Sequence, residues 1–212
     1  MKKYLLAFDQ AMRFFYQPGD IRTVPAEPTF LKSRPISDDN QTSVLLKLNR
    51  IRHYFFVQDH QPFEYKKNQL VWRGACHREH RQDFVKRFYR HPLCDVGDSH
   101  EKFSHEAWHK GFLSISQQLD YKFILSIEGN DVATNLKWVM ASNSLCFMTK
   151  PKFETWFMEG ALVPGYHYVL LADDYSDLDE KVQYYIDHPG QANAIIRNAN
   201  NYVKPFLDAP RE

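Results

Sequence analysis

The sequence has little net charge and no long apolar run, and each absence excludes a class of protein. Twenty-seven basic and 26 acidic side chains give the 212-residue chain a formal net charge of +1. Nucleic-acid-binding domains usually have a strong basic excess, so this balance argues against a nucleic-acid partner. No stretch approaches the roughly 18 apolar residues that a membrane-spanning helix needs. The composition therefore favours a globular protein that is soluble, or at most peripheral to a membrane.

Cysteines are also few, and no targeting segment is recognisable. Cys76, Cys94 and Cys146 are an odd set without regular spacing, which is typical of reduced thiols in a cytoplasmic protein rather than of a disulfide framework. The N-terminus begins with two lysines and an apolar stretch, as a signal peptide does. Asp9 and Gln10 interrupt that stretch, however, and no small-residue cleavage site follows. These features predict a cytoplasmic location.

A change in composition near residue 66 divides the chain. Before it, four prolines within residues 17–43 predict extended loop, and two short apolar runs predict strands at 44–48 and 53–57. After it, strand and helix patterns alternate. The strands expected there are 69–73, 93–96, 122–127, 145–149 and 167–171, and the helices are 78–90, 131–141, 176–187 and 190–206. This alternation predicts an α/β fold with a largely parallel sheet, which binds ligands beyond the carboxyl ends of its strands.

The first chemical candidate lies where the expected strand 69–73 ends. Arg73 and Gly74 close that strand, and Arg78 and Arg81 follow one to two helical turns later. The strand would deliver Arg73 to the carboxyl edge of the sheet, and Gly74 would let the backbone approach a ligand closely. Arginine suits phosphate because its planar guanidinium makes two parallel charged hydrogen bonds. A phosphate site is one interpretation, and a solvated helix face is the other.

A second strand-to-helix junction runs from Ser126 to Asp131. A strand ends, Gly129 turns the chain, and a helix is expected with Asn130 or Asp131 as its cap. The N-terminus of that helix would offer free N–H groups and a positive dipole to an anion. Because the Asp131 carboxylate would repel phosphate, capping is the role that suits it better.

A rival motif lies between the two junctions. His105, Glu106 and His109 match the H-E-x-x-H pattern, in which two histidines one helical turn apart bind zinc and the glutamate is the general base. Glu128 would be a candidate third ligand. The surrounding residues 97–112 have little helical periodicity, and Gly111 follows the motif directly. These two features argue against the helix that a zinc site of this kind needs. A zinc hydrolase is still kept as the weaker alternative to the phosphate-site interpretation.

Several ordered motifs resemble the lipopolysaccharide-modifying branch of glycosyltransferase family ninety, which is related to animal protein O-glucosyltransferases and fungal capsule xylosyltransferases. The resemblance covers about Gly19 to Phe206, and the order and spacing of the motifs make it specific. The matching stretches are Lys32-Ser33-Arg34-Pro35, Leu45-Leu46-Lys47-Leu48-Asn49, Val71-Trp72-Arg73-Gly74, Tyr121 to Trp138, Ser142-Asn143-Ser144, Glu154-Thr155-Trp156-Phe157, Tyr166-His167-Tyr168-Val169 and Ser176-Asp177-Leu178.

The resemblance implies a GT-B fold, in which two Rossmann-like domains enclose the active site. It implies an inverting transfer from a UDP-sugar without a metal or other cofactor. Animal relatives have an arginine where this chain has Asn135, which puts that donor contact in doubt. By position, the residues implied at the donor are Arg73, Gly74, Arg81, Gly129, Asn130, Thr134, Asn135 and Lys137, with Glu154 near the nucleoside.

The resemblance also implies the catalytic base. The family's aspartate lies in a D-x-x-x-V-P context, and Asp20 to Pro25 has that form. An inverting transfer needs one carboxylate to deprotonate the acceptor hydroxyl. Without a metal, arginines and a helix N-terminus have to stabilise the departing UDP. Asp20 as an ordinary turn residue is the alternative.

We therefore expect residues 67–212 to form a Rossmann-like donor-binding domain, and residues 1–66 to be a partial acceptor-side domain with the interdomain segment. Only 66 residues precede the first junction, so the chain is expected to be short at its start. The expected function is transfer of a hexose from a UDP-sugar to the lipopolysaccharide core, at the inner face of the cytoplasmic membrane. The alternatives are an inactive nucleotide-sugar-binding fragment and the zinc hydrolase.

Overall fold

A five-stranded parallel sheet forms the centre of the protein. The computed structural model describes residues 9, 11–48 and 54–207. The sheet has the spatial order β10-β8-β7-β5-β6, and every neighbouring pair is parallel. Its strands are β5 (Lys67–Gly74), β6 (Cys94–Asp98), β7 (Tyr121–Leu125), β8 (Leu145–Met148) and β10 (Val169–Leu170). The predicted α/β class with a parallel sheet is thus confirmed, and the arrangement is consistent with a Rossmann-like fold.

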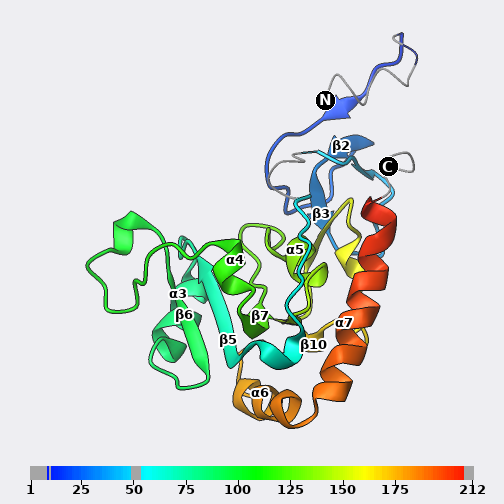
Figure 1. The fold of residues 1–212 in the computed structure, drawn as a ribbon. Helices are drawn as coiled ribbons and strands as arrows, with labels where there is room; N and C mark the ends of the chain where they lie inside the picture. Colours follow the sequence, from blue (N-terminus) through cyan, green and yellow to red (C-terminus); the bar gives the residue numbers. More distant parts are fainter. Residues whose placement is uncertain (1–8, 10, 49–53, 208–212) are drawn as a thin grey trace.

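Both faces of the sheet are covered, as a parallel sheet requires. One apolar cluster unites α3 and α6 with the first half of α7, and a second unites α5 with the end of α7. Figure 1 shows α7 running along one side of the sheet, from α6 toward the end where β2 and β3 lie. The helices are α3 (Glu79–Phe88), α4 (Ile115–Gln118), α5 (Leu136–Met140), α6 (Leu178–Asp187) and α7 (Pro189–Val203), and the 3₁₀ turns are Phe63–Tyr65, Glu101–Phe103, Glu159–Ala161 and Lys204–Leu207.

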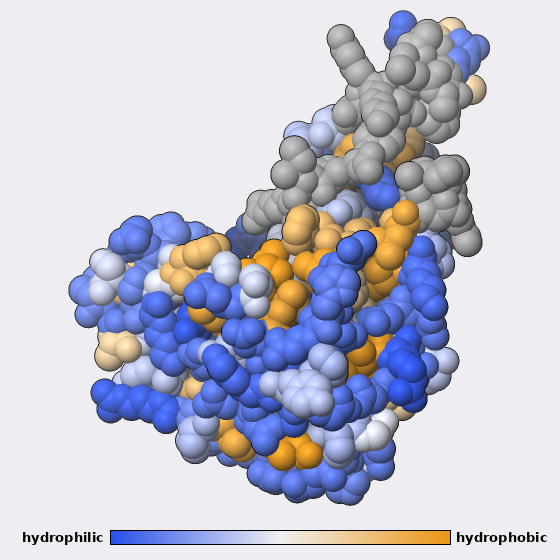
Figure 2. Space-filling model, in the orientation of Figure 1, coloured by the Kyte–Doolittle hydropathy of each residue, from blue (hydrophilic) through white to orange (hydrophobic). Residues whose placement is uncertain are grey.

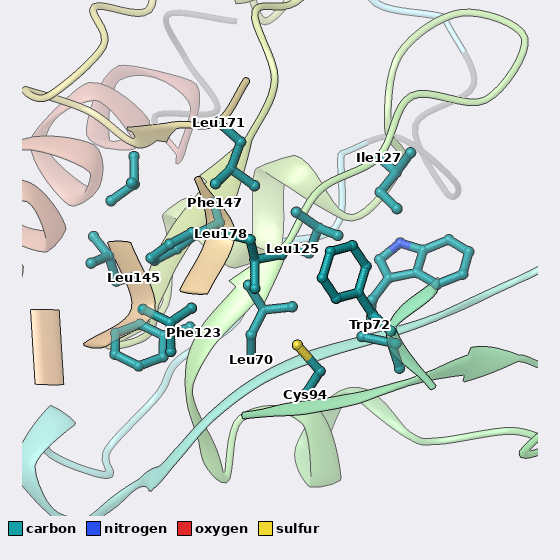
Figure 3. Packing of buried hydrophobic residues seen from close by; sticks show 14 of the residues in the cluster. Leu70, Trp72, Cys94, Phe123, Leu125, Ile127, Leu145, Phe147, Leu171 and Leu178 are labelled. Carbon is teal, nitrogen blue, oxygen red and sulfur yellow. The ribbon is translucent and has the colours of Figure 1, made fainter. Parts of the chain in front are cut away.

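The sequence of each central strand explains why both faces are buried. Successive side chains of a strand point to opposite faces, so alternate residues share one face. Leu70 and Trp72 of β5 join the first cluster, whereas Val71 between them joins the second. The same alternation recurs in β7 and β8. Figure 3 shows side chains of the first cluster packing together from these neighbouring strands. An unbroken apolar strand therefore supplies both cores at once.

The N-terminal residues form two small sheets. β1 (Phe15–Tyr16), β2 (Thr29–Leu31) and β4 (Ser43–Leu45) are parallel, in the order β1-β2-β4. β3 (Ser33–Pro35) instead pairs antiparallel with β9 (Phe153–Thr155), which follows the central strand β8. This pairing ties the N-terminal strands to the sheet domain (Figure 1). It crosses the expected boundary at residue 66, so that division stays a prediction, as does the two-domain GT-B architecture.

Three expectations about local structure were wrong. The proline-rich residues 17–43 include short strands, because β2 pairs with the nearby β4 and β3 pairs with β9, more than 100 residues later, and local sequence reveals neither pairing. Residues 54–57 are not a strand, and residue 53 lies outside the described residues. The helix expected at 131–141 begins only at Leu136, and the Asn135 side chain just before it donates to the Leu125 carbonyl oxygen instead of capping the helix.

The surface in Figure 2 is hydrophilic over most of the sheet domain, and apolar residues gather near its junction with the N-terminal segment. Among the helices of the described residues, none combines the length and the apolar character that crossing a membrane requires.

Candidate active site

The strand order defines where a ligand is expected to bind. In chain order the sheet reads 2-1-3-4-5, because β6 and β7 lie on opposite sides of β5. The crossover direction therefore reverses between β5 and β7, and sheets of this kind bind ligands at that point, beyond the carboxyl ends of the strands. The loops that begin after Gly74 and after Leu125 meet there. Both junctions singled out in the sequence are thus brought to one place.

A cavity of about 130 Å³ lies at this reversal point, and we call it the first cavity. It combines one histidine, one lysine and two arginines with two aspartates. Residues from before β3, from the loop after β5 and from the loop after β7 all contribute. Its lining residues are Asp20, Lys32, His77, Arg78, Arg81, Gly129, Asn130, Asp131, Val132 and Thr134. The predicted residues Asp20, Arg81, Gly129, Asn130 and Thr134 are therefore brought together.

Arg81 joins the two loops at the reversal point. Its guanidinium donates to the carbonyl oxygens of Ile127 (2.7 Å), Glu128 (2.9 Å) and Ala75 (3.2 Å). A Cβ at Gly129 would come within 3.2 Å of the Arg81 Nη2 atom, so glycine leaves room for the guanidinium there. Arg81 consequently orders the wall of the cavity as well as adding positive charge to it.

Asp20 faces the cavity beside a lysine that has two carboxylate partners. The Lys32 Nζ atom forms ion pairs with Asp20 Oδ1 and, at 2.8 Å, with Asp131 Oδ2. The Lys32 and Asp131 side chains are only 10% and 5% exposed, whereas the Asp20 side chain is 29% exposed. Lys32 therefore anchors Asp20 against the loop after β7 while leaving that carboxylate accessible from the cavity.

The helix N-terminus at the site belongs to α3, which is a correction. We expected a helix to begin near Asn130 and Asp131. Instead, the Asp131 carboxylate pairs with Lys32, and residues 126–135 remain a loop. α3 begins directly after His77 and Arg78, and the Arg78 side chain makes no capping hydrogen bond. Its first N–H groups and positive dipole are the ones available to an anion beside the first cavity.

The donor role that the resemblance implies for Arg73 stays a prediction, and its side chain is engaged within the protein. Arg73 is not among the residues that line the first cavity. The Arg73 guanidinium donates to the Asp95 carboxylate (2.6 Å) and to the Asp95 carbonyl oxygen (2.9 Å). Burial alone would raise the pKa of Asp95, but hydrogen bonds from Tyr121, Arg73 and Lys110 outweigh it and hold that pKa well below its ordinary value. In this structure Arg73 therefore neutralises a carboxylate inside the sheet domain.

Three further predicted donor contacts are engaged within the protein. Asn135 donates its side-chain amide to the Leu125 carbonyl oxygen (2.9 Å), which ties the loop to the end of β7. Lys137 is fully buried and pairs with Glu159 at 2.5 Å. Glu154 pairs with Arg34 at 2.8 Å across the β3–β9 ladder. Their implied roles at the donor stay predictions, as does that of Gly74.

A second cavity, of about 250 Å³, adjoins the first and shares Gly129 and Asn130 with it. Its lining residues are Arg22, His80, Ile127, Glu128, Gly129, Asn130, Thr149, Lys152, Phe153, Asp173 and Tyr175. They come from the N-terminal segment, from α3 and from the segments that follow β7, β8 and β10. The two cavities thus lie next to each other at the carboxyl edge of the sheet.

Sequence reasoning missed His77 and Lys32 as members of the site. His77 is exposed and lines the first cavity, but its place in the sequence gave no sign of this. Lys32 was noted only within a motif of the resemblance. The sequence gave no local signal for Lys32, because lysine is rarely buried, and only its pairing with Asp20 and Asp131 in the folded chain accounts for its burial.

The H-E-x-x-H motif does not have the helical geometry that its chemistry needs. Residues 104–109 are turns and a β-bridge, and the His105 side chain is 74% exposed. The His109 Nδ1 atom lies 3.2 Å from the buried Asp98 carboxylate, which also accepts the Cys76 and His100 N–H groups. Within the described part of the chain, no group of three or more His, Cys, Asp or Glu is arranged to hold a metal.

We therefore expect the purified protein to contain no stoichiometric zinc. A zinc site built on this motif would require His105 and His109 to turn toward one another from a non-helical segment. Elemental analysis of the protein, purified without chelator, measures the zinc content. One zinc per chain in the wild type, lost on His105→Ala, would contradict this expectation and restore the hydrolase alternative.

Comparison with known proteins agrees with the motifs. The profile described as Glycosyl transferase family 90 matches residues 48–211. The O-glucosyltransferase LpsA of Dichelobacter nodosus is 50% identical over 206 residues, which cover 97% of this chain and 65% of LpsA. Protein O-glucosyltransferase 2 of Danio rerio is 28% identical over 178 residues, 80% of this chain and 35% of that protein. Protein O-glucosyltransferase 3 of Homo sapiens is 27% identical over 155 residues, 69% of this chain and 30% of that protein.

This chain thus spans about two thirds of the length of LpsA and about one third of the two animal proteins. The resemblance expected from the motifs is confirmed, because the family profile covers most of the chain and LpsA shares half of the aligned residues over nearly all of it. By these two measures, the chain belongs to glycosyl transferase family 90.

Proposed function

We propose that this protein transfers a hexose, most simply glucose, from a UDP-sugar to a hydroxyl of the lipopolysaccharide core. The transfer is inverting and metal-independent, and it takes place at the inner face of the cytoplasmic membrane. The observation that supports this best is the first cavity, where Asp20 faces Arg78 and Arg81 at the reversal point of the sheet. The choice of glucose rests on the relatives, which are O-glucosyltransferases by name.

The proposed reaction is a single displacement at the anomeric carbon. Asp20 takes the proton of the acceptor hydroxyl as its oxygen forms the new bond to that carbon. The bond from the anomeric carbon to the β-phosphate oxygen breaks, and its electron pair leaves with UDP. Attack opposite the leaving group inverts the configuration. Asp20 suits this role because its carboxylate is accessible from the cavity yet held by Lys32.

Positive groups of the first cavity would stabilise the leaving UDP. Arg78 and His77 lie at the start of α3, so their side chains and the helix dipole favour the same anion. Arg81 adds charge while its N–H groups hold the two loops. Positive groups that the fold itself positions stabilise a leaving anion effectively, because they need little reorganisation during the reaction.

Arg78→Ala is expected to weaken UDP binding by about 10- to 100-fold, since a charged hydrogen bond contributes about 1.5–3 kcal/mol. The matched variant is Arg73→Ala. Arg73 belongs to the same junction, but it pairs with Asp95 and does not line the first cavity. It should lower the thermal midpoint while changing UDP affinity by less than about threefold.

Calorimetric titration of UDP and thermal unfolding of both variants make this comparison. The reverse pattern, with Arg73→Ala losing affinity and Arg78→Ala retaining it, would return Arg73 to the diphosphate site and remove Arg78 from it.

A second candidate function is nucleotide-sugar binding without transfer. It is favoured by one observation, that the chain aligns with 65% of LpsA. Assaying this chain beside a version extended to the length of LpsA separates the two candidates, with UDP-glucose as donor and truncated lipopolysaccharide as acceptor. UDP binding without turnover in either version supports the second candidate. Turnover in the chain itself supports transfer, and failure to bind UDP excludes both.

A further inference from the structure

Asp98 is a buried carboxylate at the carboxyl end of β6, and it is not among the residues that line either cavity. Its Oδ1 atom accepts the Cys76 N–H group at 2.7 Å, and its Oδ2 atom accepts the His100 N–H group at 2.7 Å. The His109 Nδ1 atom lies 3.2 Å from the same Oδ2 atom. Burial alone would raise the pKa of Asp98, but the hydrogen bonds from these groups outweigh it and hold that pKa below its ordinary value. Asp98 is therefore ionised at neutral pH, with both oxygens occupied.

The groups that Asp98 holds belong to two loops, which follow β5 and β6. Cys76 lies in the loop after β5, directly before His77 and Arg78, which line the first cavity. His100 lies in the loop after β6, and its ring packs edge-to-face against the His77 ring at 4.3 Å between ring centroids. Asp98 thus reaches the wall of the first cavity by two routes, through the backbone of Cys76 and through the ring of His100.

Resting on the proposed function, we propose that Asp98 is a positioning residue for the diphosphate of the donor. It fixes the Cys76 N–H group, and α3 begins only three residues later, at Glu79. The His77 and Arg78 side chains and the first N–H groups of α3 follow from that point, so their places depend on it. Asp98 does not itself contact the ligand. A misplacement of about 1 Å away from the reacting atoms can cost an enzyme about a hundredfold, so a residue of this kind has a measurable effect.

A carboxylate is the side chain that this place requires. Two backbone N–H groups reach it from different loops, and each oxygen accepts one of them. Asparagine has one oxygen and one NH₂ group, which is itself a donor. In Asp98→Asn one of the two backbone N–H groups would therefore face another donor inside the protein, where an unpaired polar group is costly. One of the two loops would then leave its place at the first cavity.

The experiment measures the Kd of UDP by calorimetry and the Kd of uridine by nuclear magnetic resonance titration, both on this chain. Uridine lacks the diphosphate, so the ratio of the two Kd values reports the diphosphate contacts. The wild type should prefer UDP, and Asp98→Asn should lower that preference by about tenfold or more. The Kd of uridine should change by less than about twofold, whereas a merely structural role would weaken both ligands alike or neither.

Asp95→Asn is the matched control, because Asp95 lies three residues earlier in the same strand and is held in a similar way. Its carboxylate accepts from Arg73, Tyr121 and Lys110, and these three are not among the residues that line either cavity. Both Asp→Asn substitutions should lower the thermal midpoint, but Asp95→Asn should retain the wild-type preference for UDP. An equal loss of preference in the two variants would overturn the inference, since it would reflect general damage to the end of β6.

His100→Ala tests the second route and decides the matter if Asp98→Asn does not fold. It removes the ring that packs on His77 but retains the N–H group that Asp98 accepts. Because the His100 side chain is partly exposed, this variant should fold, and its preference for UDP should fall by about threefold.

An unchanged preference in Asp98→Asn would overturn the inference, as would an unchanged preference in His100→Ala where Asp98→Asn does not fold. Equal losses of UDP and uridine affinity in Asp98→Asn would overturn it as well. A wild type that binds uridine as tightly as UDP would overturn this inference alone, whereas failure of the wild type to bind either ligand would overturn the proposed function with it.

Discussion

Asp20→Asn is expected to lower sugar transfer by at least about 100-fold while changing the affinity for UDP by less than about twofold. A general base acts on the acceptor hydroxyl in the transition state, so its loss appears in turnover and not in donor binding. Asparagine retains the size of the side chain but cannot take the proton. Turnover is measured with UDP-glucose and truncated lipopolysaccharide in whichever length of chain transfers, and the Kd of UDP is measured by calorimetry.

Asp131→Asn is the matched control for this prediction. Asp131 is the other carboxylate of the first cavity and pairs with the same Lys32 Nζ atom. Because only Asp20 is proposed to take the proton, Asp131→Asn should reduce turnover far less than Asp20→Asn. Near-normal turnover in Asp20→Asn would exclude Asp20 as the base. Equal losses in the two variants would indicate that the ion-pair cluster, rather than a base, is what transfer requires.

Lys137→Met is expected to lower the free energy of unfolding by about 3–5 kcal/mol, which is the cost of leaving one partner of a buried ion pair without the other. Lys137 and Glu159 are 0% and 1% exposed, and Glu159 also accepts the Thr155 N–H and hydroxyl groups. Methionine fills much of the volume of lysine, so the unpaired Glu159 carboxylate accounts for most of the loss. UDP affinity should not change, because Lys137 is not among the residues that line either cavity. Urea unfolding and calorimetry measure the two quantities.

A second substitution separates the ion pair from packing. Glu159→Gln in the Lys137→Met background removes the unpaired charge, so it should recover part of the lost stability. Unchanged stability of Lys137→Met together with a large loss of UDP affinity would contradict this account. Lys137 would then have the donor-binding role that the resemblance implies.

The alternation of strands and helices after residue 66 could be predicted from the sequence because it depends on local patterns. Apolar runs such as Tyr121–Leu125 are buried on both faces of a parallel sheet, and α3 shows its apolar face as Phe84, Val85 and Phe88. The two strand-to-helix junctions were found for the same reason. Each consists of a strand end, a glycine and polar residues that lie close together in the chain.

The partners of polar side chains were not predictable in this way. Arg73 and Asn135 have the residue type and chain position of ligand contacts, yet Asp95 and the Leu125 carbonyl oxygen engage them. An arginine that binds a ligand and an arginine that pairs with a carboxylate cannot be told apart in a sequence. The carboxylate partner depends on which strands are neighbours in the sheet, and the sequence alone does not show that order. The Asp131 carboxylate, which was expected to cap a helix, likewise pairs with Lys32, about a hundred residues earlier in the chain.

By itself, therefore, the sequence determined the α/β class, the two junctions at the carboxyl edge and, through its motifs, the family. Only the tertiary structure decided which charged groups line the first cavity. It brought Asp20 and Lys32 beside the loop after β7, and it paired Arg73 with the partly buried Asp95 and Lys137 with the buried Glu159. The physical reason is that hydrophobic periodicity is a local property of the chain. The pairing of charges instead depends on distances of a few ångströms between segments that only the folded chain brings together.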